Sequence, residues 1–117
     1  MFKIPNPEDQ QRLVEEYDVL AKNSRKDGKP YILSMHVGRQ LTDGNNNENV
    51  DPRSQGWTVV AETRFASLAD MRYYDEADAA HAALREKAKK GCGIVGGPAG
   101  VLTVYFEAGV EVGAEKE

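Results

Sequence analysis

The stretch WTVVAETRFASLADMRYYDEADAAHAAL, residues 57–84, decides the fold of this chain. Its first nine residues place Trp57 and Phe65 at the two ends of one apolar face, with the alternation that is typical of a half-buried strand. Ser67, followed three residues later by Asp70, is a capping-box pattern that predicts the start of a helix. Because almost no residues separate this strand from this helix, the two must fold back on each other.

Four further elements surround this unit. Residues 2–4 are predicted to form a short strand, and Asn6 is predicted to cap a first helix. Residues 31–41 alternate as a second strand, and the β-branched and aromatic run at 101–107 forms the last one. The resulting order, βαββαβ, predicts an α+β, ferredoxin-like fold with a four-stranded antiparallel sheet and both helices on one face.

The face of this sheet that the helices leave open also carries apolar residues. Val60 alternates with Val59, and Leu102 and Phe106 alternate with Val101, so both registers are apolar or bulky. An open face of this kind needs a cover, and a second copy of the chain packed sheet to sheet supplies one. We therefore expect a homodimer.

Composition places the chain among ordinary globular domains. The 117 residues form one domain, expected over 1–107 with a tail at 108–117, and 40% of them are apolar. A net charge of −4 argues against nucleic acid or an anionic membrane as a partner. Cys92 is the single cysteine and has no internal disulfide partner, which favours a cytoplasmic location. The sequence has no apolar run near the roughly 18 residues that span a bilayer.

Two motifs that could bind cofactors are better explained as structure. The GCGIVG stretch at 91–96 matches GxGxxG, but it follows a predicted helix and precedes a strand, the reverse of a dinucleotide loop. His36 and His81 are the two histidines, and neither belongs to an HxH or HExxH pattern. We expect no cofactor and no metal. His36, in mid-strand, is expected to be structural or to lie at a subunit interface.

His81 and Tyr74 are the candidate reactive pair on the second predicted helix, residues 67–90, which is expected to bend near 75–78. In an unbroken helix their seven-residue spacing is two turns, about 10.5 Å. At that distance they would flank a small ligand, with Tyr74 donating to a carbonyl and His81 moving a proton. Asp78 lies one turn before His81 and is placed to orient the ring. A histidine on a helix stripe is also commonly a satisfied residue at the edge of a core.

Two segments resemble a known family. TRFASLADMRYYDEADAAHAAL (63–84) combines a strand ending in Phe, a Ser-Leu cap, a tyrosine and a histidine about two turns later, and VLTVYFE (101–107) is the second segment. Both are similar to the stress-responsive α/β-barrel (Dabb) family, a resemblance that covers nearly all of residues 1–107. It implies a ferredoxin-like protomer and a dimeric α/β barrel.

The resemblance also implies activities. Some members are stress-induced proteins without assigned chemistry, and others are hydroxynitrile lyases or polyketide cyclases of the olivetolic acid cyclase type, which use no cofactor. In the cyclase a histidine on the second helix is the general base and a tyrosine on that helix orients the substrate carbonyl. By resemblance these roles fall on His81 and Tyr74, with Tyr73 as the alternative because the spacing differs by one residue. Tyr17 matches a tyrosine that lines the cyclase pocket.

Two functions follow as hypotheses. The first is a cofactor-free cyclase or lyase acting on a small aromatic or polyketide-like molecule, and the second is a non-enzymatic, stress-responsive dimer with some capacity to bind hydrophobic ligands. An open cavity between the second helix and the sheet favours the enzyme, and a filled interior favours the alternative. The residues expected to line such a cavity are Tyr17, Leu33, Met35, Trp57, Val59, Ala61, Phe65 and Leu84.

Overall fold

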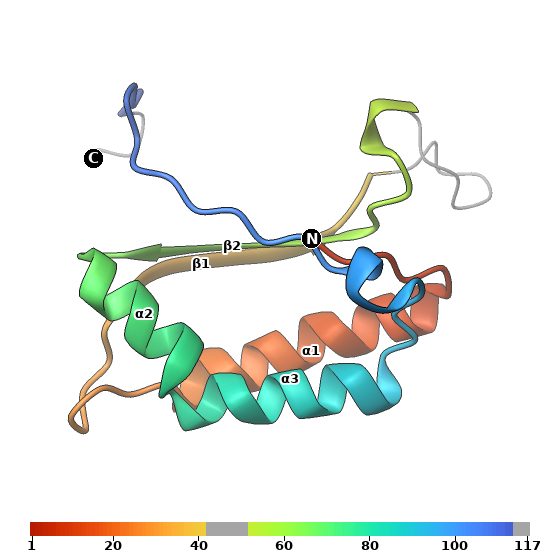
Figure 1. Ribbon diagram of the computed structural model, residues 1–117. Helices are drawn as coiled ribbons and strands as arrows, with labels where there is room; N and C mark the ends of the chain where they lie inside the picture. Colours follow the sequence, from red (N-terminus) through yellow and green to blue (C-terminus); the bar gives the residue numbers. More distant parts are fainter. Residues whose placement is uncertain (42–51, 114–117) are drawn as a thin grey trace.

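The computed structural model describes residues 1–41 and 52–113. In chain order its elements are α1 (Pro7–Asn23), β1 (Ile32–Arg39), the 3-10 turn η1 (Pro52–Ser54), β2 (Val59–Phe65), α2 (Leu68–Glu76), α3 (Ala79–Gly91) and the 3-10 turn η2 (Gly97–Gly100). The strands β1 and β2 are antiparallel, and the three helices lie together on one face of them (Figure 1). The α+β character and the one-sided helix layer agree with the prediction.

Helix α1 begins where the sequence indicates. The side chain of Asn6 accepts a hydrogen bond from the Glu8 N–H at 2.8 Å, and Pro7 occupies the first helical position. Leu13 and Tyr17 lie on the buried stripe of this helix, which packs against α3 and β1. The cap and the apolar spacing together therefore set both the start and the orientation of α1.

A tight turn leads from α1 into β1. Lys26 and Lys29 exchange backbone hydrogen bonds across Asp27 and Gly28, whose φ values of 53° and 76° are both left-handed. Two consecutive residues with positive φ define a type I′ turn, for which Asp-Gly is a preferred pair. The Lys26 ammonium contacts the Asp70 carboxylate at 2.6 Å, so this turn is attached to α2.

The register of the sheet differs from strict alternation at one position. Met35 pairs with Thr63, but the register shifts between Ile32 and Ser34. This irregularity places Leu33 on the solvent side with 64% of its surface exposed. The prediction that Leu33 shares the inner face with Met35 is therefore wrong, because a one-residue bulge reverses the faces of a strand.

The predicted single helix over 67–90 is two helices. Ala77 ends α2, and Asp78 caps α3 by accepting from the Ala80 N–H at 2.8 Å and the His81 N–H at 3.4 Å. The Ala77 and Asp78 N–H groups both donate to the carbonyl of Tyr73. A cap at Asp78 requires extended backbone there, so the bend expected near 75–78 is a complete break.

The first and last predicted strands appear only as isolated pairings. Phe2 bridges Val59 on one side and Val101 on the other, and both bridges are antiparallel. This gives the neighbour order of a ferredoxin-like sheet. Within the described residues, however, the sheet contains two strands and not the predicted four. Pro5 follows the short segment at once and cannot continue a strand ladder.

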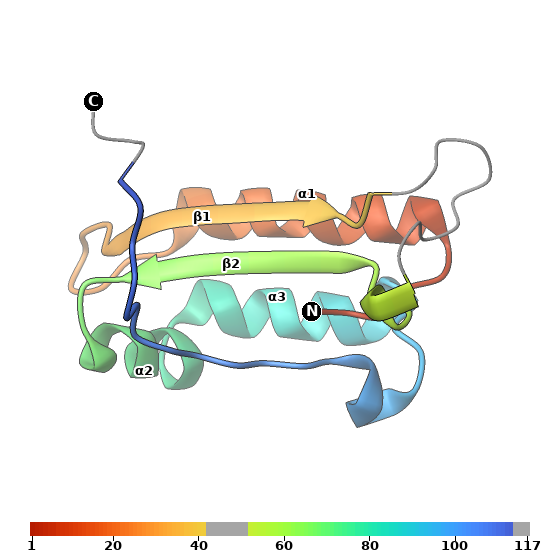
Figure 2. The same cartoon turned by 90° about the horizontal axis from the view of Figure 1, so that it is seen from above.

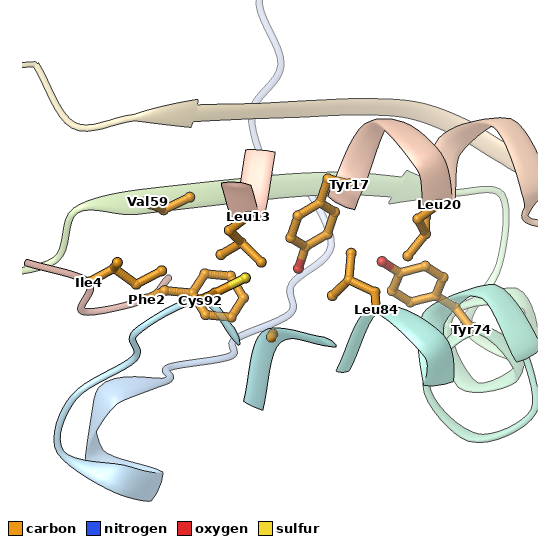
Figure 3. Packing of buried hydrophobic residues seen from close by; sticks show 10 residues of the cluster. Phe2, Ile4, Leu13, Tyr17, Leu20, Val59, Tyr74, Leu84 and Cys92 are labelled. Atoms are coloured by element: carbon orange, nitrogen blue, oxygen red, sulfur yellow. The ribbon is translucent and has the colours of Figure 1, made fainter. Parts of the chain in front are cut away.

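The core lies between the sheet and the helix layer. Figure 3 shows its aromatic and aliphatic side chains converging from α1, α3, β2 and the N-terminal segment. Phe2 packs edge-on against Tyr17 with ring centroids 6.2 Å apart, and Leu84 reaches the same cluster from α3. Burial of this kind contributes about 1.5–3 kcal/mol for each large apolar side chain.

The opposite face of β1 and β2 is more polar than the sequence pattern suggested. His36 and Glu62 pair across this face at 3.3 Å, and both are exposed. Exposed apolar side chains gather instead on the C-terminal stretch, where Val104 is 71% and Phe106 is 83% exposed. Leu33 and Val60 are exposed on the strands themselves, and a larger set of exposed apolar side chains lies on that stretch.

Candidate active site

His81 is held inside the protein by the first turn of α3. Only 8% of its surface is exposed, and its Nδ1 lies 2.9 Å from the carbonyl oxygen of Tyr74. A carbonyl oxygen only accepts, so Nδ1 carries the proton in this hydrogen bond and Nε2 carries the lone pair of the neutral ring. The geometry therefore leaves Nε2 as the basic atom.

The rings of Tyr74 and His81 are stacked on each other. Their centroids are 3.9 Å apart and their planes differ by 16°. The break at Asp78 changes the direction of the chain between them, so the spacing of two turns expected for an unbroken helix does not apply. A ligand has no room between these two rings, and any substrate must approach from another side.

Burial shifts the pKa values of both members of this pair. Desolvation lowers the pKa of His81, Arg85 lowers it further, and the Tyr74 carbonyl acts in the opposite direction. Desolvation raises the pKa of the Tyr74 phenol, and the nearby Thr63 side chain acts in the opposite direction. At neutral pH the pair is therefore a neutral imidazole and a protonated phenol.

Asp78 is the centre of a buried network that the sequence reading did not foresee. Its Oδ2 accepts hydrogen bonds from the Ser24 hydroxyl and, at 2.5 Å, from the Tyr31 hydroxyl. Its Oδ1 caps α3, so it holds the backbone of His81 and not the imidazole. Asp75 is the carboxylate beside the ring, with Oδ1 3.9 Å from Nδ1.

The two candidate tyrosines have different surroundings. The Tyr73 hydroxyl donates to the carbonyl of Arg25 at 2.9 Å, and the Tyr73 ring lies edge-on to Tyr31 at 5.3 Å. Tyr73 thus contacts and stabilises the turn between α1 and β1. The structure brings Tyr74, and not Tyr73, to His81.

The predicted lining residues fall into two groups. Phe65 packs beside Tyr74 with ring centroids 5.1 Å apart, and it belongs to one cluster with most of the others. The residues of that cluster are Tyr17, Met35, Val59, Ala61, Phe65 and Leu84. Leu33 and Trp57 lie apart from it, since Leu33 is exposed and Trp57 stacks under the Lys3 ammonium at 4.7 Å.

Two hollows in the surface are distinct from the His81 region. A groove of about 330 Å³ lies between α1 and α3, lined in part by Leu20, Ala80 and Leu84. A second hollow of about 300 Å³ is lined in part by Trp57 and Leu102. Neither is lined by His81 or Tyr74. Leu84 lies between the rings of Tyr17 and Tyr74 and fills the space beside them (Figure 3).

Comparison with known proteins identifies the family. Residues 1–95 match the family described as Stress Responsive A/B Barrel Domain. The chain belongs to this stress-responsive A/B barrel family. This match confirms the resemblance drawn from residues 63–84. A "Fusaristatin A biosynthesis cluster protein" of Gibberella zeae (strain PH-1) is 40% identical over 114 residues, which cover 97% of this chain and 73% of that protein. No solved structure matches.

The described residues also give negative findings for metal-binding clusters and membrane-spanning helices. Across residues 1–41 and 52–113, no group of three or more His, Cys, Asp or Glu side chains is placed to hold a metal ion. In the same part of the chain, no helix has the length and apolarity to cross a membrane. The imidazole of His81 and the phenol of Tyr74, which stack on each other, are a pair of side chains able to accept and to donate a proton.

Proposed function

We propose that this family member acts in small-molecule biosynthesis as a cofactor-independent cyclase or lyase on a small aromatic or polyketide-like substrate. Family membership and the similarity to a biosynthesis-cluster protein support the biosynthetic role. The observation that carries the chemistry is the 2.9 Å hydrogen bond from His81 Nδ1 to the Tyr74 carbonyl. This hydrogen bond leaves the lone pair of the neutral ring on Nε2, and a general base requires such a lone pair.

The proposed reaction is an aldol-type ring closure. Nε2 of His81 takes a proton from a carbon that lies between two carbonyl groups. The resulting enolate carbon bonds to a ketone carbon of the same molecule, and the new alkoxide recovers the proton from the imidazolium. The Tyr74 hydroxyl donates to the enolate oxygen, and one such donor in a dry site lowers the barrier by about 2.7–4 kcal/mol.

We also propose a homodimer and a cytoplasmic location. The exposed apolar residues of the C-terminal stretch, Val104 and Phe106 among them, support pairing with a second copy. Cys92 is a free, buried thiol, which suits a reducing compartment.

Replacement of His81 by glutamine tests the chemistry. Glutamine is polar and of similar size but has no basic nitrogen, so turnover of a linear poly-β-keto thioester should fall by about 10²–10⁴-fold. His36→Gln is the matched control, because His36 is exposed and pairs with Glu62 on the outer face, away from the helix layer. Equal turnover by wild type and His81→Gln, with both folded by circular dichroism, would rule out His81 as the base.

A second candidate function has its own support. The interior beside Tyr74, on which His81 stacks, is occupied by Leu84 and Phe65 (Figure 3), and neither of the two surface hollows is lined by the histidine. A filled interior favours a non-enzymatic, stress-responsive dimer. Titration of the labelled protein with aromatic fragments separates the two functions. Shifts in the His81 and Tyr74 ring resonances support the enzyme, and shifts confined to the groove between α1 and α3 support the alternative.

A further inference from the structure

Arg85 is an exposed cation on α3 that has no acidic residue one turn away on its own helix. Side chains three and four positions apart on a helix are neighbours, and the positions so related to Arg85 carry His81, Ala82, Ala88 and Lys89. Lys87, by contrast, pairs with Glu16 of α1 at 3.5 Å. Within residues 1–41 and 52–113, neither Arg85 nor Lys89 forms an ion pair.

His81, Arg85 and Lys89 form one row on α3, here called the basic row. Their spacing of four residues places each about 6 Å farther along the helix axis, on the same side of the helix. The groove between α1 and α3 is lined in part by Ala83 and Lys87, which therefore lie on the flank toward α1. At about 100° per residue, the basic row runs along the opposite flank, away from α1.

Helix α2 lies beside the start of this opposite flank. Seen from above, α1 lies on one side of α3, and α2 lies on the other side, next to the first turns of α3 (Figure 2). There the ring of His81 stacks on Tyr74, and its Nδ1 lies 3.9 Å from the Asp75 carboxylate. Arg85 and Lys89 are exposed, so the flank is open to solvent from one turn beyond the buried imidazole.

The charges around His81 leave the basic row without an anion at its exposed end. Desolvation is the largest influence on the pKa of His81 and lowers it, Arg85 lowers it further, and Asp75 and Asp78 act in the opposite direction. Both carboxylates are thus on the imidazole side of Arg85. Arg85 and Lys89 are like charges one turn apart, an arrangement that destabilises a helix slightly. A bound anion would remove this repulsion.

We infer that Arg85 binds the carboxylate of a small keto acid of the proposed aromatic class, with the carbonyl end of the ligand turned toward His81. This inference rests on the proposed function and narrows its substrate class, since a neutral ester or thioester of the same skeleton would bind more weakly. The guanidinium offers a carboxylate two parallel N–H donors, which provide orientation as well as affinity. Lys89 adds a second positive charge beside the bound anion.

A matched acid and ester test the anion site by affinity. The probes are 3-acetylbenzoate and its neutral methyl ester, which share the ring and the ketone and differ in charge. In low-salt buffer the wild-type protein should bind the acid about 3–10-fold more tightly than the ester, a modest factor because charged pairs at exposed positions are weak. This preference should decrease at high salt, where exposed charges are screened. Nuclear magnetic resonance titration of the labelled protein measures both dissociation constants.

Substitutions on the two flanks of α3 assign the preference to one side chain. Arg85→Gln should abolish the preference for the acid, and Arg85→Lys should keep part of it, because an ammonium retains the charge but not the fork of donors. Lys87→Gln is the matched control, since Lys87 lies on the flank toward α1 and pairs with Glu16. Arg85 and Lys87 are both exposed, so all three variants should remain folded by circular dichroism.

The pKa of His81 gives a readout that does not require turnover. Arg85→Gln should raise this pKa in the free protein and Asp75→Asn should lower it, because the two side chains act on the imidazole with opposite sign. Bound 3-acetylbenzoate should raise the pKa of wild-type His81, as Arg85→Gln does, since its carboxylate neutralises the guanidinium. The methyl ester should leave the pKa unchanged.

The possible results separate the anion site from the proposed chemistry. Equal affinity for acid and ester, no binding of either at millimolar concentration, a preference that survives in Arg85→Gln, or a His81 pKa that the acid does not change would each overturn the site. None of these results bears on the His81→Gln assay. Loss of the preference in Arg85→Gln, together with full turnover by His81→Gln, would support the site and overturn the proposed general base.

Discussion

Replacing Asp78 by alanine removes the acceptor on which three parts of the fold depend. Asp78 is 3% exposed and caps α3, and it also accepts from Ser24 at the end of α1 and from Tyr31 at the start of β1. Loss of the cap costs about 1 kcal/mol. The loss of each hydroxyl partner adds about 1–2 kcal/mol, since hydrogen bonds to charged groups are the stronger ones.

The expected decrease in the free energy of unfolding is therefore about 3–5 kcal/mol, a large share of the 5–15 kcal/mol typical of a domain. Urea denaturation followed by far-ultraviolet circular dichroism measures it. Asp18→Ala is the matched control, because Asp18 pairs with Lys22 on the exposed surface and its loss should cost about 0.5 kcal/mol or less. An Asp78→Ala variant no less stable than Asp18→Ala would refute the network as a source of stability.

The pH dependence of Asp78→Asn provides a second check. Burial alone would raise the pKa of Asp78, but hydrogen bonds from Ser24, Tyr31 and the first turn of α3 outweigh it and hold the pKa below its usual value. A lowered folded-state pKa stabilises the protein above about pH 4, and this contribution is lost as pH falls through the lowered value. The difference in the free energy of unfolding between wild type and Asp78→Asn should therefore become smaller below pH 4. A difference in unfolding free energy that stays constant down to pH 2.5 would contradict the lowered pKa of Asp78.

Three further predictions follow from the packing. Leu84→Ala should lower the free energy of unfolding by about 2–5 kcal/mol in urea titrations, because the side chain is buried among aromatic rings. Gly100→Ala should lower the free energy of unfolding by at least about 1–3 kcal/mol, since the added Cβ would lie 1.9 Å from the Val95 carbonyl oxygen. Gly91→Ala is the control, because a Cβ at Gly91 meets open space and should change the stability little. The ¹⁵N chemical shifts of His81 should report a proton on Nδ1 and a pKa below 6.5; a proton on Nε2 at neutral pH would contradict the hydrogen bond to the carbonyl.

Local signals in the sequence predicted the elements well where each signal is contained in a few neighbouring residues. Asn6 and Ser67 cap helices as expected, because a cap needs only the N–H groups two or three positions later. The strand 59–65 has the predicted inner face, since its alternation is uninterrupted. Tyr17 and Leu84 are buried for the same reason, as members of regular helical stripes.

Other features depended on partners that periodicity does not reveal. Leu33 lies on the solvent side because of a bulge, and the position of a bulge depends on how the two strands pair. The terminal strands were predicted from their composition, but a strand requires a neighbour along its whole length, and Phe2 supplies one only at Val59 and Val101. The candidate site was recognised by residue type, while its stacked geometry was not foreseen.

The sequence by itself determined where helices start, which residues of β2 face inward, and that a histidine and a tyrosine lie close on the same part of the chain. Tertiary structure alone decided that Tyr74 stacks on His81, because that contact follows from the break at Asp78. The break is stabilised by Ser24 and Tyr31, which lie 54 and 47 residues away along the chain. A carboxylate that can accept several hydrogen bonds takes its partners from whichever elements the fold brings to it, and no local pattern encodes that choice.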